Sequence, residues 1–170
     1  MVSIRPARPS DTDAIVAVNA AGWRTGYRGI VSDDRLASLP VERWRSEIRA
    51  GLARPAGDSF SLVGELGGAF GGYCYVAAPA RDGDLGREAA ELVAIYVEPA
   101  LWGRGVGGAL IAAAEEEAVA RGYEEMSLWT FTDNDRARGF YQRRGWRADG
   151  NERLHPLAGA SAIRMRKQIG

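Results

Sequence analysis

The stretch Val97-Glu-Pro-Ala-Leu-Trp-Gly-Arg-Gly-Val-Gly-Gly-Ala-Leu110 decides the fold, because it leads from a buried strand through a glycine-rich turn into a helix. The apolar residues of 91–97 predict the strand, and Pro99, which cannot donate to a sheet, marks its exit. Apolar residues on one side of 105–121 predict the helix, and Gly122 is a natural C-cap. The first N–H groups of such a helix lack acceptors within it, so the turn can bind a phosphate.

Three interpretations of this glycine turn differ in the ligand. A tight turn without a ligand also uses glycines, because glycine adopts positive φ at little cost. A dinucleotide-binding turn needs a different glycine spacing and an acidic residue downstream. A nucleotide P-loop needs a Lys-Ser/Thr pair, whereas Gly108-Ala109 stands near that place. Local chemistry alone leaves phosphate binding and a purely structural turn open.

The flanking segments predict a single α/β domain over residues 1–170. Strands are predicted at 2–5, 59–66, 69–77, 91–97, 126–131, 146–148 and 162–165, and further helices near 10–22, within 23–52 and at 134–144. Gly67-Gly68 suits a hairpin turn, and the polar residues 80–89 predict a loop. Ser10 and Asp13 resemble a capping box, and Gly22 suits the end of the first helix.

Composition excludes several classes of protein. The 170 residues include 22 Lys or Arg and 22 Asp or Glu, so no net charge favours nucleic acid. No apolar run approaches the roughly 20 residues that span a membrane. One Cys and one His form neither an internal disulfide nor a usual zinc site. We therefore expect a cytoplasmic protein with no metal, no nucleic-acid partner and no membrane partner. Glycine is enriched, with 22 residues against a usual share of about 7%, which indicates particular backbone tasks.

Three motifs resemble the GNAT superfamily of acetyl-CoA-dependent N-acetyltransferases. Trp102-Gly-Arg-Gly-Val-Gly107 resembles the acetyl-CoA pyrophosphate loop, Gln/Arg-x-x-Gly-x-Gly/Ala, although Trp102 replaces the usual Gln or Arg. Ile95-Tyr-Val-x-Pro99 and Asn134-x-x-Ala-x-x-Phe-Tyr-x-x-x-Gly-Trp146 are also similar to that family. The resemblance implies the GNAT fold, a mixed, mostly antiparallel twisted sheet of about seven strands flanked by about four helices.

The resemblance also implies direct transfer of the acetyl group of acetyl-CoA to a primary amine of a small molecule, protein or peptide, in a ternary complex. The implied cofactor-binding residues are Ile95, Tyr96, Val97, Gly103, Arg104, Gly105, Val106, Gly107, Gly108, Asn134 and Tyr141. Backbone groups of Ile95 and Val97 would pair with the pantetheine arm, and Arg138, Arg143 and Arg144 are candidates for the ribose phosphate. Homodimers are common in the family. The alternative is a non-catalytic acyl-CoA-binding or sensor module.

Two residues are candidates for proton transfer. Tyr141, in the motif that begins at Asn134, would be the general acid near the thioester sulfur. Glu91 would be the general base, because it begins an apolar strand and because some histone-acetylating relatives have a Glu at a similar distance before the loop. Glu98 and Asp133 are alternatives, and His155, predicted in a loop, is a candidate second base. An amine with a pKa of about 10.4 needs such help, since neutralising it at pH 7 costs roughly 4.6 kcal/mol.

Aromatic residues near the N-terminus are candidates for the acceptor pocket. Trp23 and Tyr27 are four apart and share a helical face, although core packing is an alternative. Arg24 and Arg28 could meet an acidic acceptor or simply be solvated. The lone Cys74 is most simply a small core residue. The identity of the acceptor amine stays open.

Overall fold

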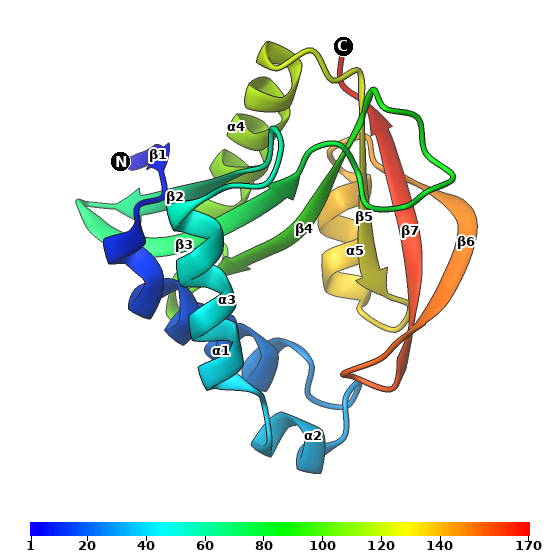
Figure 1. Ribbon diagram of the computed structural model, residues 1–170. Helices are drawn as coiled ribbons and strands as arrows, with labels where there is room; N and C mark the ends of the chain where they lie inside the picture. Colours follow the sequence, from blue (N-terminus) through cyan, green and yellow to red (C-terminus); the bar gives the residue numbers. More distant parts are fainter.

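A seven-stranded sheet runs through the middle of the computed structural model, which describes residues 1–170 (Figure 1). The strands in chain order are β1 (Val2–Pro6), β2 (Phe60–Leu66), β3 (Ala69–Ala77), β4 (Ala89–Val97), β5 (Glu125–Phe131), β6 (Arg147–His155) and β7 (Ala160–Gln168). The helices are α1 (Thr12–Gly26), α2 (Asp33–Ala37), α3 (Val41–Ala53), α4 (Val106–Ala120) and α5 (Asp135–Gln142), with 3-10 turns at Pro9–Asp11 and Pro99–Leu101. The predicted α/β fold is confirmed, with five α-helices in place of about four.

The sheet order is β1-β2-β3-β4-β5-β7-β6, and only β4 and β5 pair in parallel. That parallel pairing covers only 89–92 of β4 and 125–128 of β5. Beyond it β4 continues beside β3, whereas β5 continues beside β7. Val93 is an extra residue, since Leu92 pairs with Val76 and Ala94 pairs with Tyr75. Such a bulge bends a strand, so β4 and β5 diverge (Figure 1).

Alternating side chains of the strands enter different hydrophobic clusters, of which there are three. Leu62 and Cys74 face the core under α4, whereas their neighbours Val63 and Tyr73 face the core under α1. Burial raises the pKa of the Cys74 thiol to about 12, as expected of an inert core residue. Figure 1 shows α1 and α3 together on one side of the sheet. None of the helices is long and apolar enough to cross a membrane.

Two expectations about the first helix are wrong. The helix does not end at Gly22 but continues to Gly26. Gly22 serves a close approach instead, since a Cβ there would lie 2.6 Å from Cδ1 of Tyr96. Ser10 and Asp13 do not form the capping box, because a 3-10 turn precedes the helix. The carboxylate of Asp11 accepts the N–H of Arg8 at 2.7 Å.

The last two strands are longer than predicted. Apolar residues predicted only 146–148 and 162–165, whereas β6 and β7 each contain nine residues. Strand β6 is an edge strand with mostly exposed side chains, so it lacks the alternation that identifies a half-buried strand. As a result His155 ends a strand and does not lie in a loop.

Replacing Leu110 by Ala should lower the free energy of unfolding by about 2–5 kcal/mol, because the change leaves a cavity in the core. Leu110 belongs to α4 and is completely buried. Leu154 is the matched control, since it is 68% exposed, and its replacement by Ala should change stability by less than about 0.5 kcal/mol. Urea unfolding measures both values, and similar losses in the two variants would contradict this description of the core.

Candidate functional site

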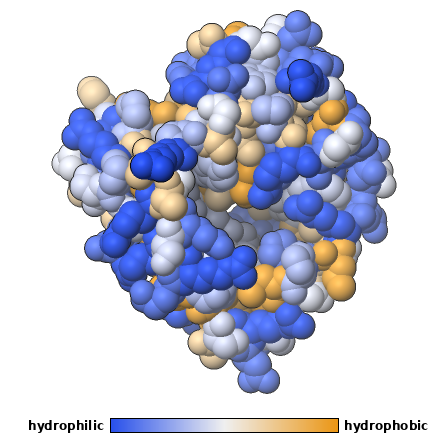
Figure 2. All heavy atoms as spheres, viewed as in Figure 1, coloured by the Kyte–Doolittle hydropathy of each residue, from blue (hydrophilic) through white to orange (hydrophobic).

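Two cavities meet where β4 and β5 diverge. Cavity A, of about 310 Å³, is lined from α1, β4, β5, β6 and α5. Cavity B, of about 510 Å³, is lined from β4, the glycine turn and the helices α4 and α5. The residues that line both are Ile95, Val97, Trp102, Arg136, Ala137 and Tyr141. Figure 2 shows the molecule hollowed near the middle of this view.

The glycine turn lines cavity B with unpaired backbone groups. Gly103 and Gly105 have φ of 78° and 89°, a conformation that strains any residue with a Cβ. Gly105 is the N-cap of α4, and as a glycine it offers no side chain to cap the helix. The first N–H that bonds within the helix is that of Ala109, which donates to the carbonyl of Gly105. The amides of residues 105–108 are therefore free donors at the positive end of a helix. This arrangement fits a phosphate group.

Basic side chains from the end of α5 complete cavity B. Arg143 and Arg144 line it, and Arg144 is fixed by a hydrogen bond to the carbonyl of Phe140 at 3.0 Å. Arg138 lies elsewhere, because its guanidinium donates to the carbonyl of Thr132. Arg104 is exposed and lines neither cavity. Of the arginines considered from sequence, only Arg143 and Arg144 are placed to meet an anion there.

The free edge of β4 faces the cavities. The N–H of Glu98 donates to Gly71 on the β3 side at 2.9 Å, and backbone direction alternates along an antiparallel pair. Ile95 and Val97 therefore point their N–H and C=O groups away from β3, into the space between β4 and β5. The indole Nε1 of Trp102 donates to the carbonyl of Val97 at 2.9 Å. Tyr96, between them, lines cavity A.

Tyr141 lies at the junction of the two cavities. Its ring is buried beside Phe140 and Trp146, and no protein group hydrogen-bonds its hydroxyl. Burial raises the pKa of Tyr141 well above its usual range, so the phenol carries its proton at neutral pH. Asn134 caps α5, its Oδ1 accepting the N–H of Ala137 at 3.1 Å, and it lines cavity A.

Glu91 also lines cavity A, with its side chain only 2% exposed. Arg81 donates to it three times, from Nε and the backbone N–H to Oε2 at 2.9 and 3.2 Å and from the guanidinium to Oε1 at 2.7 Å. A carboxylate offers about four acceptor positions, so one position on Oε1 stays available. Glu98 and Asp133 are exposed and line neither cavity.

Aromatic residues from the end of α1 and from β5 form part of the lining of cavity A. Trp23 and Tyr27 both line it, with their ring centroids 5.0 Å apart, and Tyr27 lies edge-on to Phe131 at 4.8 Å. The hydroxyls of Tyr27 and Tyr96 are 3.2 Å apart. Arg24 and Arg28 are exposed and outside the lining.

His155 lines cavity A from the end of β6. Its Nδ1 accepts the N–H of Ala158 at 3.2 Å, which assigns the proton of the neutral ring to Nε2. Burial, followed by the charge of Arg153, lowers the pKa of this imidazole. His155 is therefore a neutral N–H donor, an arrangement that disfavours the second-base hypothesis.

Three lining arginines were not identified from sequence: Arg81, Arg136 and Arg153. Arg136 lies over the Trp102 ring at 3.5 Å, and Arg153 lies over the Trp129 ring at 4.0 Å. Arg136 could have been found, since it sits two residues after Asn134 in a recognised motif. Arg81 lies in an irregular loop and Arg153 in an edge strand, and neither position carries a periodic signal.

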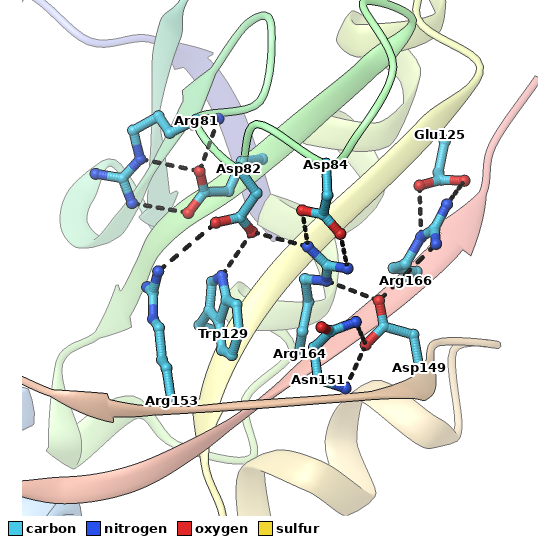
Figure 3. Close-up of polar contacts among 11 residues, drawn as sticks. Arg81, Asp82, Asp84, Glu125, Trp129, Asp149, Asn151, Arg153, Arg164 and Arg166 are labelled. Atoms are coloured by element: carbon cyan, nitrogen blue, oxygen red, sulfur yellow. Dashed lines mark hydrogen bonds and ion pairs between the residues drawn. The ribbon is translucent and has the colours of Figure 1, made fainter.

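An ion-pair network centred on Arg164 holds the β3–β4 loop over β5 and β7 (Figure 3). The Arg164 side chain is 3% exposed, and its guanidinium donates to Asp84 at 2.7 and 2.6 Å and to Asp149 at 2.7 Å. These hydrogen bonds raise the pKa of Arg164. Asp82 of the same loop accepts the indole N–H of Trp129 at 2.8 Å. The network fixes the loop that carries Arg81.

Comparison with known proteins identifies relatives of this chain. Residues 24–146 match the Acetyltransferase (GNAT) family. The chain is 30% identical over 138 residues to an uncharacterized N-acetyltransferase, YuaI, of Bacillus subtilis, covering 79% of this chain and 74% of that protein. It is 26% identical over 165 residues to a probable N-acetyltransferase, Rv2775, of Mycobacterium tuberculosis, covering 94% and 88%.

The fold also matches solved structures. The PaiA N-acetyltransferase of Thermoplasma acidophilum, solved in complex with coenzyme A, superposes with a TM-score of 0.82 at 20% identity, over 99% of each chain. At that identity the likeness shows the fold alone. No group of three or more His, Cys, Asp or Glu side chains is arranged to hold a metal ion.

Proposed function

Since the chain belongs to the GNAT family of acetyltransferases, we propose that it transfers the acetyl group of acetyl-CoA directly to a primary amine, with both substrates bound together. The observation that carries this proposal is the junction of two cavities at Tyr141. Cavity B has the donors for a phosphate-bearing cofactor. Cavity A has room for a second molecule, and Glu91 and Tyr141 both line it.

Acetyl-CoA supplies the acetyl group as an activated thioester. The amides of residues 105–108 would bind its pyrophosphate, with Arg143 and Arg144 beside them. The outward N–H and C=O groups of Ile95 and the N–H of Val97 would pair with the pantetheine arm, as a neighbouring strand would. The carbonyl of Val97 already accepts the Trp102 indole. Asn134 retains its side-chain N–H groups for the same arm, because only its Oδ1 is engaged in capping α5.

The acceptor amine must lose a proton before or during attack on the carbonyl carbon. Oε1 of Glu91 accepts that proton, directly or through one water, because it keeps a free acceptor position. A C–N bond forms as the C–S bond breaks. Tyr141 then donates its phenolic proton to the departing sulfur. The two groups need no covalent enzyme intermediate.

A non-catalytic acyl-CoA-binding module is the competing function. Such a module needs cavity B but has no use for cavity A and its proton-transfer groups. Release of free thiol from acetyl-CoA in the presence of a panel of amines tests the choice. Thiol release supports the transferase, whereas tight binding of acetyl-CoA without release for any amine supports the module.

Replacing Gly105 by Ala should weaken coenzyme A binding at least tenfold, because a Cβ at φ of 89° distorts the amides of the turn. Gly150, with φ of 90° and nothing within 4 Å of an added Cβ, is a matched control outside both cavities. Both variants should lose about 1–2 kcal/mol of stability. Calorimetric titration measures affinity, and equal affinities in the two variants would contradict the assigned phosphate site.

Replacing Tyr141 by Phe should lower kcat by roughly 10- to 100-fold, because general-acid catalysis commonly contributes about 10²-fold or more. Acetyl-CoA affinity should change little. Tyr73→Phe is the control, since Tyr73 is equally buried but lines neither cavity. Steady-state thiol release measures kcat, and an unchanged kcat for Tyr141→Phe would remove the proposed acid role.

Replacing Glu91 by Gln should abolish the rise of kcat/KM on the acidic side of the pH profile, because the amide cannot take a proton from the amine. Glu88→Gln is the control, since Glu88 is exposed and lines neither cavity. Persistence of an unchanged acidic limb in Glu91→Gln would place the base elsewhere.

A further inference from the structure

The charged groups that line cavity A are mostly positive. The lining contains three arginines, Arg81, Arg136 and Arg153, but only one carboxylate, Glu91. Glu91 already accepts three hydrogen bonds from Arg81, so Arg81 balances its charge and one acceptor position remains, for the reacting amine. The other guanidinium groups would repel any further positive charge. The cavity therefore suits an acceptor whose only positive charge is on the reacting amine.

Arg153 is, with Arg136, one of the two lining arginines that have no carboxylate oxygen within hydrogen-bond distance. Its nearest carboxylate oxygen is Oδ1 of Asp82 at 3.7 Å, beyond hydrogen-bond distance. The other oxygen of Asp82 accepts the Trp129 indole at 2.8 Å and lies 3.4 Å from Arg164. Burial lowers the pKa of the Arg153 guanidinium, despite the opposing charge of Asp82. The Arg153 guanidinium therefore keeps free N–H donors.

The surroundings of Arg153 hold it in place. Its guanidinium lies on the Trp129 ring, with 4.0 Å from Cζ to the ring centroid, and Asp82 in turn binds that indole (Figure 3). His155 is two residues further along β6 and thus on the same face of the strand. Its neutral ring adds one N–H donor to the lining. Two donors therefore occupy adjacent same-face positions at one end of cavity A.

The rest of that end is apolar and aromatic. The ring centroids of Trp23 and Phe131 lie 5.6 and 5.4 Å from that of His155, and both residues line the cavity. The volume of about 310 Å³ is at the small end of the range for small-molecule sites. Flat rings beside fixed donors suit a molecule with one apolar part and one anionic part.

We propose that the acceptor is a small amine that carries a carboxylate and an apolar or aromatic side chain, with Arg153 binding the carboxylate and the Trp23–Phe131 wall contacting the side chain. This inference rests on the proposed acetyl transfer and names the class of its acceptor. Arg153 pairs with the carboxylate through charge-assisted hydrogen bonds. The amine is then held between this end of the cavity and the junction at Tyr141.

The test compares matched amines in the thiol-release assay with the full-length protein. L-Phenylalanine carries the carboxylate, L-phenylalaninamide and 2-phenylethylamine lack it, and spermidine carries further positive charges. The amine of the amide is less basic than that of phenylalanine, so amine ionisation alone would favour the amide. We expect kcat/KM for phenylalanine to exceed that of each other amine at least tenfold.

Variants then assign the preference to Arg153. Arg153→Met keeps an unbranched stem against Trp129 but removes the charge, and the phenylalanine-to-phenylethylamine ratio of kcat/KM should fall at least tenfold. Arg147→Met is the control, because Arg147 is an exposed residue of the same strand outside both cavities. That variant should leave the ratio unchanged.

The outcomes separate the two proposals. Faster turnover of phenylethylamine or spermidine than of phenylalanine overturns the inference and leaves the acetyltransferase proposal standing. An unchanged ratio in Arg153→Met overturns the role of Arg153. Absence of thiol release with every amine, in a protein that binds acetyl-CoA, overturns both proposals.

Discussion

Parallel pairing of β4 with β5 ends at Leu92 and Leu128, and the bulge at Val93 turns the rest of β4 away. A strand in the middle of a sheet normally has hydrogen-bond partners on both sides, and buried backbone groups without partners are costly. Here the groups of Ile95 and Val97 face a space instead of a strand. Both cavities open from that space, so the position of every site residue depends on this separation.

Trp102 reduces the free-energy cost of these unpaired backbone groups. Its indole N–H donates to the carbonyl of Val97, so one exposed acceptor of β4 already has a partner. The pyrophosphate-loop motif of the GNAT family usually has Gln or Arg at this position, and both of those side chains are also N–H donors. The Trp keeps a donor but adds a flat ring, over which Arg136 lies at 3.5 Å. This stacked pair belongs to the lining of both cavities.

The sequence predicts the parts of this site that local rules determine. Apolar runs, glycines and the Asn134 motif placed β4, the turn, α4 and α5 within about two residues, since each has a periodic or conformational signal. Two of the lining cations, Arg81 and Arg153, had no such signal. Arg81 owes its position to Glu91, ten residues away, and Arg153 owes its position to Trp129 in another strand. Gly22 has an ordinary helical conformation. Glycine is needed there because the ring of Tyr96, 74 residues away in the sequence, leaves no room for a Cβ.

Arg164 lies outside cavity A but determines the electrostatic character of that cavity. A buried guanidinium must have its charge compensated, and Arg164 takes Asp84 and Asp149 for that purpose. Asp82 is divided between Trp129, Arg164 and the more distant Arg153. Arg153 is left to solvent for much of its stabilisation, since its side chain is 40% exposed. A molecule bound in cavity A displaces some of that water. The displaced solvation has to be replaced by the bound molecule itself, because every nearby carboxylate of the protein is already engaged.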